Sequence, residues 1–424
     1  MSMSMNPQQP APGPSGNRPG DPQWQFHEQT NPSWMGHVQQ QNYRPAPGHH
    51  GGAVSQVIPP SATTVAARPS SGVLSLVVMG AILAFVSLFL VIPFLLASTG
   101  VTGFAVGFVA SLIPLGAVLL SVRVIDRWEP EPKRLLVFAF TWGAAVSIAV
   151  TLLIQPVFAL AAPTASEESF RDFMTTVQAP VVEEFAKSLG LLLLLLMARR
   201  HFDGPVDGVV FAFTIAGGFA FTENILYFGR AIAESSTPGS DLAQIFFLRG
   251  VMSPFAHAIF TGTTGLIMGF AARRWHSGLS VAGFVVGLIP AMILHNRWNS
   301  MGQDFLAQYV LVQVPIFLLA VGCIVALRVA ETRLTRQRLL EYSAAGWFTP
   351  AEVGMLATAG GRRQAVRWAA AYNRAPQMKA FVKAATQLAF TRQRILSGRD
   401  VQSHQQEELQ QLHHLMALRA AVGH

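Results

Sequence analysis

A series of long apolar segments decides what this chain can fold into. Eight such segments lie near residues 73–97, 101–122, 135–160, 178–198, 207–229, 251–272, 278–296 and 306–328. Several exceed the ~18 consecutive apolar residues that indicate a membrane-spanning helix. Only 12% of the 424 residues are charged, about half of the roughly 25% that soluble domains carry. We therefore predict an all-α, polytopic membrane helix bundle with about eight transmembrane helices, and we exclude a soluble enzyme.

The two ends of the chain differ in composition from this apolar centre. Residues 1–72 are rich in Pro, Gln, Gly, Ser and His, and such a segment buries too little apolar surface to offset the entropy of ordering. Residues 329–424 carry 13 basic and 6 acidic side chains. The single cysteine, Cys323, excludes a disulfide scaffold. We predict a disordered N-terminal tail over 1–72, a membrane domain over 73–328 and a basic helical cytoplasmic tail over 329–424.

The basic tail contains a helix start signal. Thr349, Pro350 and Glu352 have the spacing of a capping box with proline at the first helical position. We expect this helix to end at Gly360-Gly361 and a second, amphipathic helix to run over about 362–397. Two interpretations fit: a tail attracted to anionic lipid heads, or a small helical hairpin domain. No nucleic-acid-binding motif is present, so the charge does not indicate DNA binding.

The connections between apolar segments differ in charge on their two sides. Eight basic residues lie in the second, fourth and sixth connections: Arg123, Arg127, Lys133, Arg134, Arg199, Arg200, Arg273 and Arg274. Four lie in the alternate connections: Arg171, Arg230, Arg249 and Arg297. Because the more basic side faces the cytoplasm, we predict a multi-pass protein of the cell membrane with both termini cytoplasmic.

Ionisable residues inside the apolar segments are the candidates for function. A charged side chain at mid-membrane costs roughly 3 kcal/mol, so it indicates a functional site. The segment 178–198 contains Glu183, Glu184 and Lys187. Lys187 follows Glu183 by four residues, the favoured order for a helical ion pair. A purely structural pair of these two would leave Glu184 without a partner.

Three further apolar segments each contain such residues. Glu223 lies beside Asn224 in 207–229, His257 lies in 251–272, and His295 is followed one turn later by Asn299. A protonated Glu223 bonded to a backbone carbonyl is the alternative for that residue. No other histidine lies in an apolar segment, which favours a shared site over two unrelated core residues.

Carboxylates and imidazoles of this kind suit two mechanisms of hydrolysis. In the first, Glu223, His257 and His295 bind zinc and leave a position for water, while Glu183 or Glu184 is the general base. In the second, Glu and His activate water without a metal, and His295 with Asn299 stabilises the oxyanion. Spacing leaves both open, because the sequence has no His-Glu-x-x-His motif.

The ordered set of motifs resembles the PrsW-type intramembrane proteases, which are related to the CAAX prenyl protease and bacteriocin-processing clan. The resemblance covers roughly 126–300. It rests on Asp126–Pro132, Glu183-Glu184-x-x-Lys187, Asp203-Gly204 with Asp207-Gly208, Phe219-x-x-x-Glu223-Asn224, His257 and His295-x-x-x-Asn299. We interpret the Asp126–Pro132 part as an interfacial loop whose acids pair with Arg127 and Lys133.

The resemblance implies an intramembrane endopeptidase of the metallo or glutamate type. Its substrate would be a membrane protein, such as a single-span anti-sigma-factor-like regulator. By similarity, Glu183, Glu184 and His257 would be catalytic, and Glu223 and His295 would complete the site. Lys187, Asn224 and Asn299 would support it. A proton- or ion-coupled transporter and a non-catalytic membrane scaffold are the alternatives, since intramembrane Glu and His also mark ion pathways.

Overall fold

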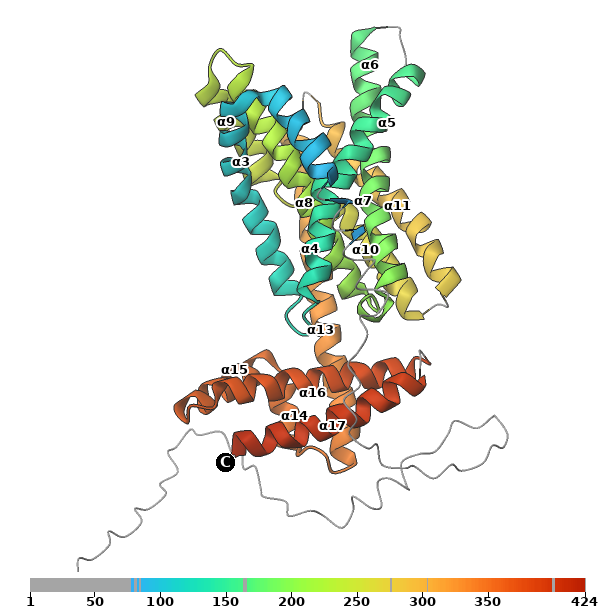
Figure 1. Ribbon diagram of the computed structural model, residues 1–424, viewed down its shortest axis with the longest axis vertical. Helices are drawn as coiled ribbons and strands as arrows, with labels where there is room; N and C mark the ends of the chain where they lie inside the picture. The colour runs from blue at the N-terminus through green and yellow to red at the C-terminus, as the bar shows by residue number, and fades with distance from the viewer. Residues whose placement is uncertain are drawn as a thin grey trace, which may run out of the picture. The chain divides into compact units, whose positions relative to one another are not determined.

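A computed structural model describes residues 78–423 except 80, 81, 84, 163–165, 275, 276, 303, 399 and 400. The tail predicted over 1–72 lies outside these residues. Every regular element in the described part is a helix (Figure 1), which confirms the all-α prediction. Two compact units form. A membrane unit ends at Arg333 and includes Gln393–Gln402, and a C-terminal unit comprises Leu334–Arg392 and Ser403–His424.

The membrane unit consists of long helices, several of which contain one π-helical turn, labelled η. The first elements along the chain are η1 (Ser87–Val91), α3 (Ile92–Ile125), α4 (Lys133–Thr141), η2 (Trp142–Ser147), α5 (Ile148–Ala161), α6 (Glu167–Phe173), η3 (Met174–Gln178), α7 (Ala179–Met197) and the short 3-10 helix η4 (Arg199–His201). They are followed by α8 (Pro205–Ala233), α9 (Pro238–Phe246), η5 (Phe247–Met252), α10 (Ala256–Arg274), α11 (Ser277–Asn299), α12 (Phe305–Gln308), η6 (Tyr309–Gln313) and α13 (Val314–Ala344).

Six helical stretches of the described chain are long and apolar enough to cross a membrane. They are Ser87–Ile125, Lys133–Ala161, Pro205–Ala233, Pro238–Arg273, Ser280–Asn299 and Phe305–Ala344. The prediction was about eight, and two physical causes explain the difference. The segments 73–97 and 101–122 share the stretch Ser87–Ile125, and α7 has three charged residues, more than the two that a span identified by composition is allowed. The protein is therefore a multi-pass membrane protein.

The stretch Ser87–Ile125 is interrupted between its two predicted segments. Its 39 residues would extend about 58 Å as a straight helix, roughly twice the thickness of a bilayer core. Gly100 breaks the helix with φ 64° and ψ 172°, a conformation that glycine adopts without steric cost. The stretch thus has the length of two spans, and the break falls between them.

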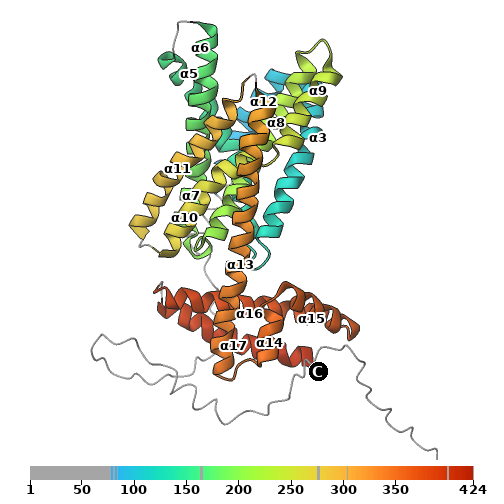
Figure 2. The same ribbon diagram turned by 180° about the vertical axis from the view of Figure 1, so that it is seen from behind.

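Helix α8 lies at the centre of the membrane unit. Its most apolar window is 78% buried, more than that of any other candidate span in the described chain. Glycines allow its neighbours to approach closely: a Cβ at Gly143 would overlap the carbonyl oxygen of Ile215, and a Cβ at Gly208 would overlap that of Gly265. Such small-residue contacts are typical of helix interfaces in membranes. Helices α7, α10 and α11 lie beside one another in both views (Figures 1 and 2).

The C-terminal unit contains α14 (Pro350–Leu356), α15 (Ala359–Ala371), and most of α16 (Ala375–Leu396) and of α17 (Val401–Gly423) (Figure 2). It has its own apolar core, in which Phe381, Leu388 and Leu415 are buried. The capping box is confirmed, since Thr349 N donates to Glu352 Oε2 at 2.7 Å and Thr349 Oγ1 accepts from Glu352 N at 3.2 Å. The core favours the interpretation as a small helical domain.

The helix expected over 362–397 is wrong in its extent. The structure divides it into α15 and α16, because the chain turns at Asn373, which has φ 57°. Gly360 and Gly361 lie in the first turn of α15 and do not end α14. Asparagine tolerates this left-handed conformation better than most residues, so Asn373 was the available signal for the break.

Candidate active site

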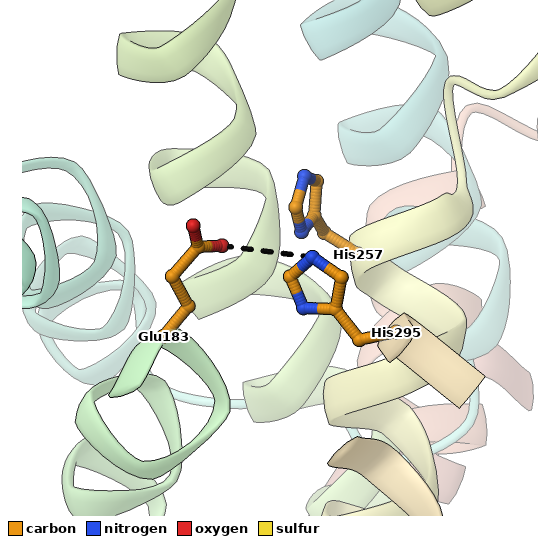
Figure 3. A group of neighbouring side chains, drawn as sticks. All are labelled: Glu183, His257 and His295. Atoms are coloured by element: carbon orange, nitrogen blue, oxygen red, sulfur yellow. Dashed lines mark ion pairs between the residues drawn. The ribbon is translucent and has the colours of Figure 1, made fainter. Parts of the chain in front are cut away.

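Four helices bring the predicted site residues together. Helix α7 contributes Glu183, Glu184 and Lys187, α8 contributes Glu223 and Asn224, α10 contributes His257 and α11 contributes His295. Figure 3 shows the side chains of Glu183, His257 and His295 pointing toward one another from three of these helices. The intramembrane carboxylates and imidazoles therefore form one constellation.

Glu184 lies at the centre of this constellation and is saturated with hydrogen bonds. It is 0% exposed. Its Oε1 accepts from Lys187 Nζ at 2.5 Å and from His295 Nδ1 at 2.9 Å, and its Oε2 accepts from Thr261 Oγ1 at 2.8 Å. Charge-assisted bonds of this kind are the strong ones. Glu184 thus anchors its neighbours and presents no unused oxygen to a substrate.

The structural alternative, an ion pair between Glu183 and Lys187, is not formed, because Lys187 pairs with Glu184. The spacing i,i+3 brings the ammonium to Glu184, whereas Glu183 points in another direction about 100° around the helix. Glu183 Oε2 is buried and accepts no hydrogen bond from any described residue. It lies 3.8 Å from His295 Nε2.

The two histidines have different hydrogen-bond states. A ring nitrogen beside a carboxylate carries the proton, so His295 donates through Nδ1 to Glu184 and its Nε2 keeps the lone pair. His257 Nε2 donates to Glu223 Oε2 at 2.8 Å, and its Nδ1 accepts from Lys187 Nζ at 3.2 Å. The lone pair that faces Glu183 therefore belongs to His295, while both nitrogens of His257 already have partners.

Arg249 is a site residue that sequence reasoning missed. Its guanidinium forms an ion pair with Glu223 Oε2, donates from Nε to Asn224 Oδ1 at 2.7 Å and lies 4.1 Å from the ring centroid of Tyr227. Only 18% of its side chain and 16% of that of Glu223 are exposed. Arg249 had been counted as a charge at the edge of a loop. The sequence feature that could have indicated Arg249 is the pair Glu223-Asn224, because two hydrogen-bond acceptors in an apolar segment require a donor.

Asn299 does not belong to this constellation. Its Nδ2 donates to the carbonyl oxygen of Thr175 at 2.8 Å, and Asn296 Nδ2 donates to that of Thr176 at 2.5 Å. Both bonds attach the end of α11 to η3. The expected oxyanion role of Asn299 is therefore absent from this arrangement, because its amide is committed to the backbone.

The donor set fits a divalent metal, with one change from the predicted ligands. Glu183, His257 and His295 each offer an atom within 4.8 Å of the others, and the buried Oε2 of Glu183 has no hydrogen bond from the described chain. Mixed carboxylate and imidazole ligands are typical of zinc. Glu223, which was predicted as a ligand, instead bridges His257 and Arg249.

The Asp126–Pro132 loop forms a separate acidic cluster in the membrane unit. Both carboxylate oxygens of Asp126 accept from Glu131 N at 3.1 Å. Arg394 donates to Glu129 Oε1 at 2.6 Å and also pairs with Asp203. Burial and the neighbouring carboxylates raise the pKa of Glu131 to about 11. The cation that pairs with Glu129 and Asp203 is thus Arg394, whereas the interpretation named Arg127 and Lys133.

Comparison with known proteins supports the resemblance. The family model for PrsW family intramembrane metalloproteases matches residues 131–320, a range that includes every side chain of the constellation around Glu184 and is less than half of the chain. Over this range the chain is similar to the PrsW family. This similarity supports a membrane-embedded protease.

Curated PrsW relatives align over much of their own length. A Protease PrsW of Oceanobacillus iheyensis is 27% identical over 214 residues, which cover 50% of this chain and 88% of that protein. A Protease PrsW of Clostridioides difficile is 31% identical over 159 residues, 37% of this chain and 63% of that protein. A Protease PrsW of Bacillus subtilis is 25% identical over 194 residues, 45% of this chain and 79% of that protein. No solved structure matches the chain.

Proposed function

We propose that this protein, like the PrsW family it resembles, hydrolyses a peptide bond of a membrane-protein substrate at Glu183 and His295. One observation carries the proposal. Glu183 Oε2 is buried, accepts no hydrogen bond from the described residues and lies 3.8 Å from the lone-pair nitrogen of His295. At this separation the two groups do not hydrogen-bond to each other directly, but both can contact one water, as general acid–base catalysis requires.

In this mechanism Glu183 takes a proton from the attacking water and returns it to the leaving amine. His295 Nε2 orients the water, because Glu184 and Thr261 fix the direction of its ring. His257, held by Glu223 and Lys187, forms the opposite wall of the site. When bound, a zinc ion held by Glu183, His257 and His295 would supply Lewis-acid activation of water and of the peptide carbonyl, and Glu183 would then be a ligand in place of its role as the base.

The substrate we propose is a single-span regulatory protein of the anti-sigma-factor type. Glu183 lies near the start of α7, shortly after η3 and α6. The charge distribution of the connections assigns α6 to the extracytoplasmic side and both termini to the cytoplasm. Cleavage is therefore expected within or beside the extracytoplasmic half of the bilayer.

Cleavage of a co-expressed single-span substrate tests the assignment. We expect Glu183→Gln to abolish cleavage without lowering thermal stability, since Oε2 has no hydrogen bond to lose. Glu184→Gln should lower both, because it weakens bonds to three neighbours. Glu234→Gln is the matched control, as that side chain is 66% exposed, and it should leave both unchanged. Cleavage at the wild-type rate by Glu183→Gln would refute the proposed base.

Elemental analysis of the purified, active protein tests the metal separately. We expect about one zinc per chain and a loss of it in His295→Ala. A metal-free protein that cleaves its substrate would assign the reaction to Glu183 and His295 alone.

A further inference from the structure

The lone pairs of the two site histidines face different groups. That of His295, on Nε2, faces the carboxylate of Glu183 at 3.8 Å. That of His257, on Nδ1, accepts from the ammonium of Lys187 at 3.2 Å. Because one lone pair cannot serve an ammonium donor and a metal ion together, His257 is not available as a ligand in this arrangement.

The ammonium of Lys187 is held firmly in this position. The side chain is 0% exposed, its Nζ lies 2.5 Å from Glu184 Oε1, and it stands 4.5 Å from the ring centroid of Phe219. A buried cation with an anionic partner and an aromatic face needs no water to be stable. Lys187 is therefore a persistent occupant of the space beside His257 Nδ1.

We propose that Lys187 is an internal cation that occupies the third ligand position of the metal site. This inference rests on the metal ligands proposed above. As it stands, the site offers two available donors, Glu183 and His295, whereas catalytic zinc sites use three protein ligands. The third donor becomes available when Lys187 withdraws from His257 and pairs with Glu184 alone. Lys187 thus positions His257 and sets the metal affinity of the site.

Two physical effects of Lys187 both lower the affinity of the site for zinc. The ammonium blocks the His257 lone pair, and its positive charge repels a divalent cation a few ångströms away in a medium of low dielectric constant. Removing Lys187 removes both effects. Arg249 differs, since it contacts Glu223 and Asn224 and has no bond to His257.

A double-mutant cycle on the full-length protein in detergent measures the effect. Zinc affinity is determined by competition with a chromophoric chelator in wild type, Lys187→Met, His257→Ala and the double variant. We expect Lys187→Met to bind zinc at least tenfold more tightly. The cost of His257→Ala should be at least tenfold smaller in the wild-type background than in the Lys187→Met background, because only the wild type must displace Lys187 from His257. Lys187→Arg, which keeps a cation, should not bind zinc more tightly than wild type.

Two results would overturn the inference. One is weaker zinc binding by Lys187→Met, and the other is an equal cost of His257→Ala in both backgrounds. Lys187→Gln replaces Lys187→Met if thermal melts show that the latter does not fold. The protease proposal is judged apart: if no variant binds zinc while Glu183→Gln still abolishes cleavage, this inference fails and the proposed base stands.

Discussion

The hydrogen bond from Thr261 to Glu184 provides a sharp test of the site. Thr261→Val removes the donor to Glu184 Oε2 and keeps the shape of the side chain. The same helix supplies a matched control. Thr264 is also 0% exposed, but its Oγ1 donates at 3.0 Å to the backbone carbonyl of Gly287. The two substitutions differ in the acceptor that loses its donor, which is a site carboxylate for Thr261 and a backbone carbonyl for Thr264.

The structure sets the size of the expected effect. Side-chain hydrogen bonds inside membrane proteins contribute about 0.6 kcal/mol on average, which is the cost expected for Thr264→Val. A bond to an ionised acceptor is roughly twice as strong, so Thr261→Val should cost about 1.2 kcal/mol, or about sevenfold in the unfolding equilibrium constant. Glu184 loses one of three donors, and its hold on His295 weakens accordingly.

Reversible unfolding in mixed detergent measures stability, and cleavage of a single-span substrate measures activity. We expect Thr261→Val to lower the rate of cleavage at least tenfold and Thr264→Val to leave it within twofold of wild type. If Thr264→Val lowers cleavage as much as Thr261→Val does, the loss reflects helix packing, and the anchoring role of Glu184 is refuted.

Two further predictions concern the bundle and the acidic loop. Gly143→Ala places a methyl group against the carbonyl oxygen of Ile215 and should lower the free energy of unfolding by about 1–3 kcal/mol. Gly116→Ala, which has open space around it, is the control and should leave stability unchanged. Equal melting temperatures for the two variants would argue against a close contact with α8. The raised pKa of Glu131, about 11, means that the folded state retains a proton which the unfolded state releases above its ordinary value of 4.5. The free energy of unfolding should therefore fall as pH rises from 5 to 9, and it should fall less in Glu131→Gln. If the melting temperatures of wild type and Glu131→Gln change with pH in the same way, Glu131 does not titrate as proposed.

The sequence was sufficient to find the carboxylates and imidazoles that the structure brings together, but not all of their neighbours and not how they are paired. An ionisable group in an apolar segment is costly wherever it lies, so Glu183, Glu184, Glu223, His257 and His295 could be found without coordinates. Their partners depend on how the helices are rotated. Lys187 lies three residues from Glu184 and four from Glu183, and both spacings allow an ion pair; only the packed bundle directs it to Glu184.

Arg249 and Asn299 show the same limit for single residues. Arg249 lies in η5, a π-helical turn that changes the direction of later side chains and leaves no mark in the hydropathy pattern. Asn299 lies one turn after His295, which suggests a shared face, but at the end of α11 its amide bonds to Thr175 in η3. Local spacing could not reveal contacts between elements far apart in the chain.

The charges of α7 also have a consequence for how this protein enters the membrane. Three charged residues cost up to about 8–10 kcal/mol on insertion if they lie at a helix centre, and less in the first half of α7, whereas the six leucines of Leu191–Leu196 contribute only about 2–4 kcal/mol in favour of insertion. Lys187 neutralises Glu184 within the helix itself, but His295 follows Glu184 by 111 residues. During synthesis α7 is therefore complete long before the helix that completes its polar network. Stable insertion of α7 depends on the arrival of α11, so assembly of the active site is itself a step in the biogenesis of the bundle.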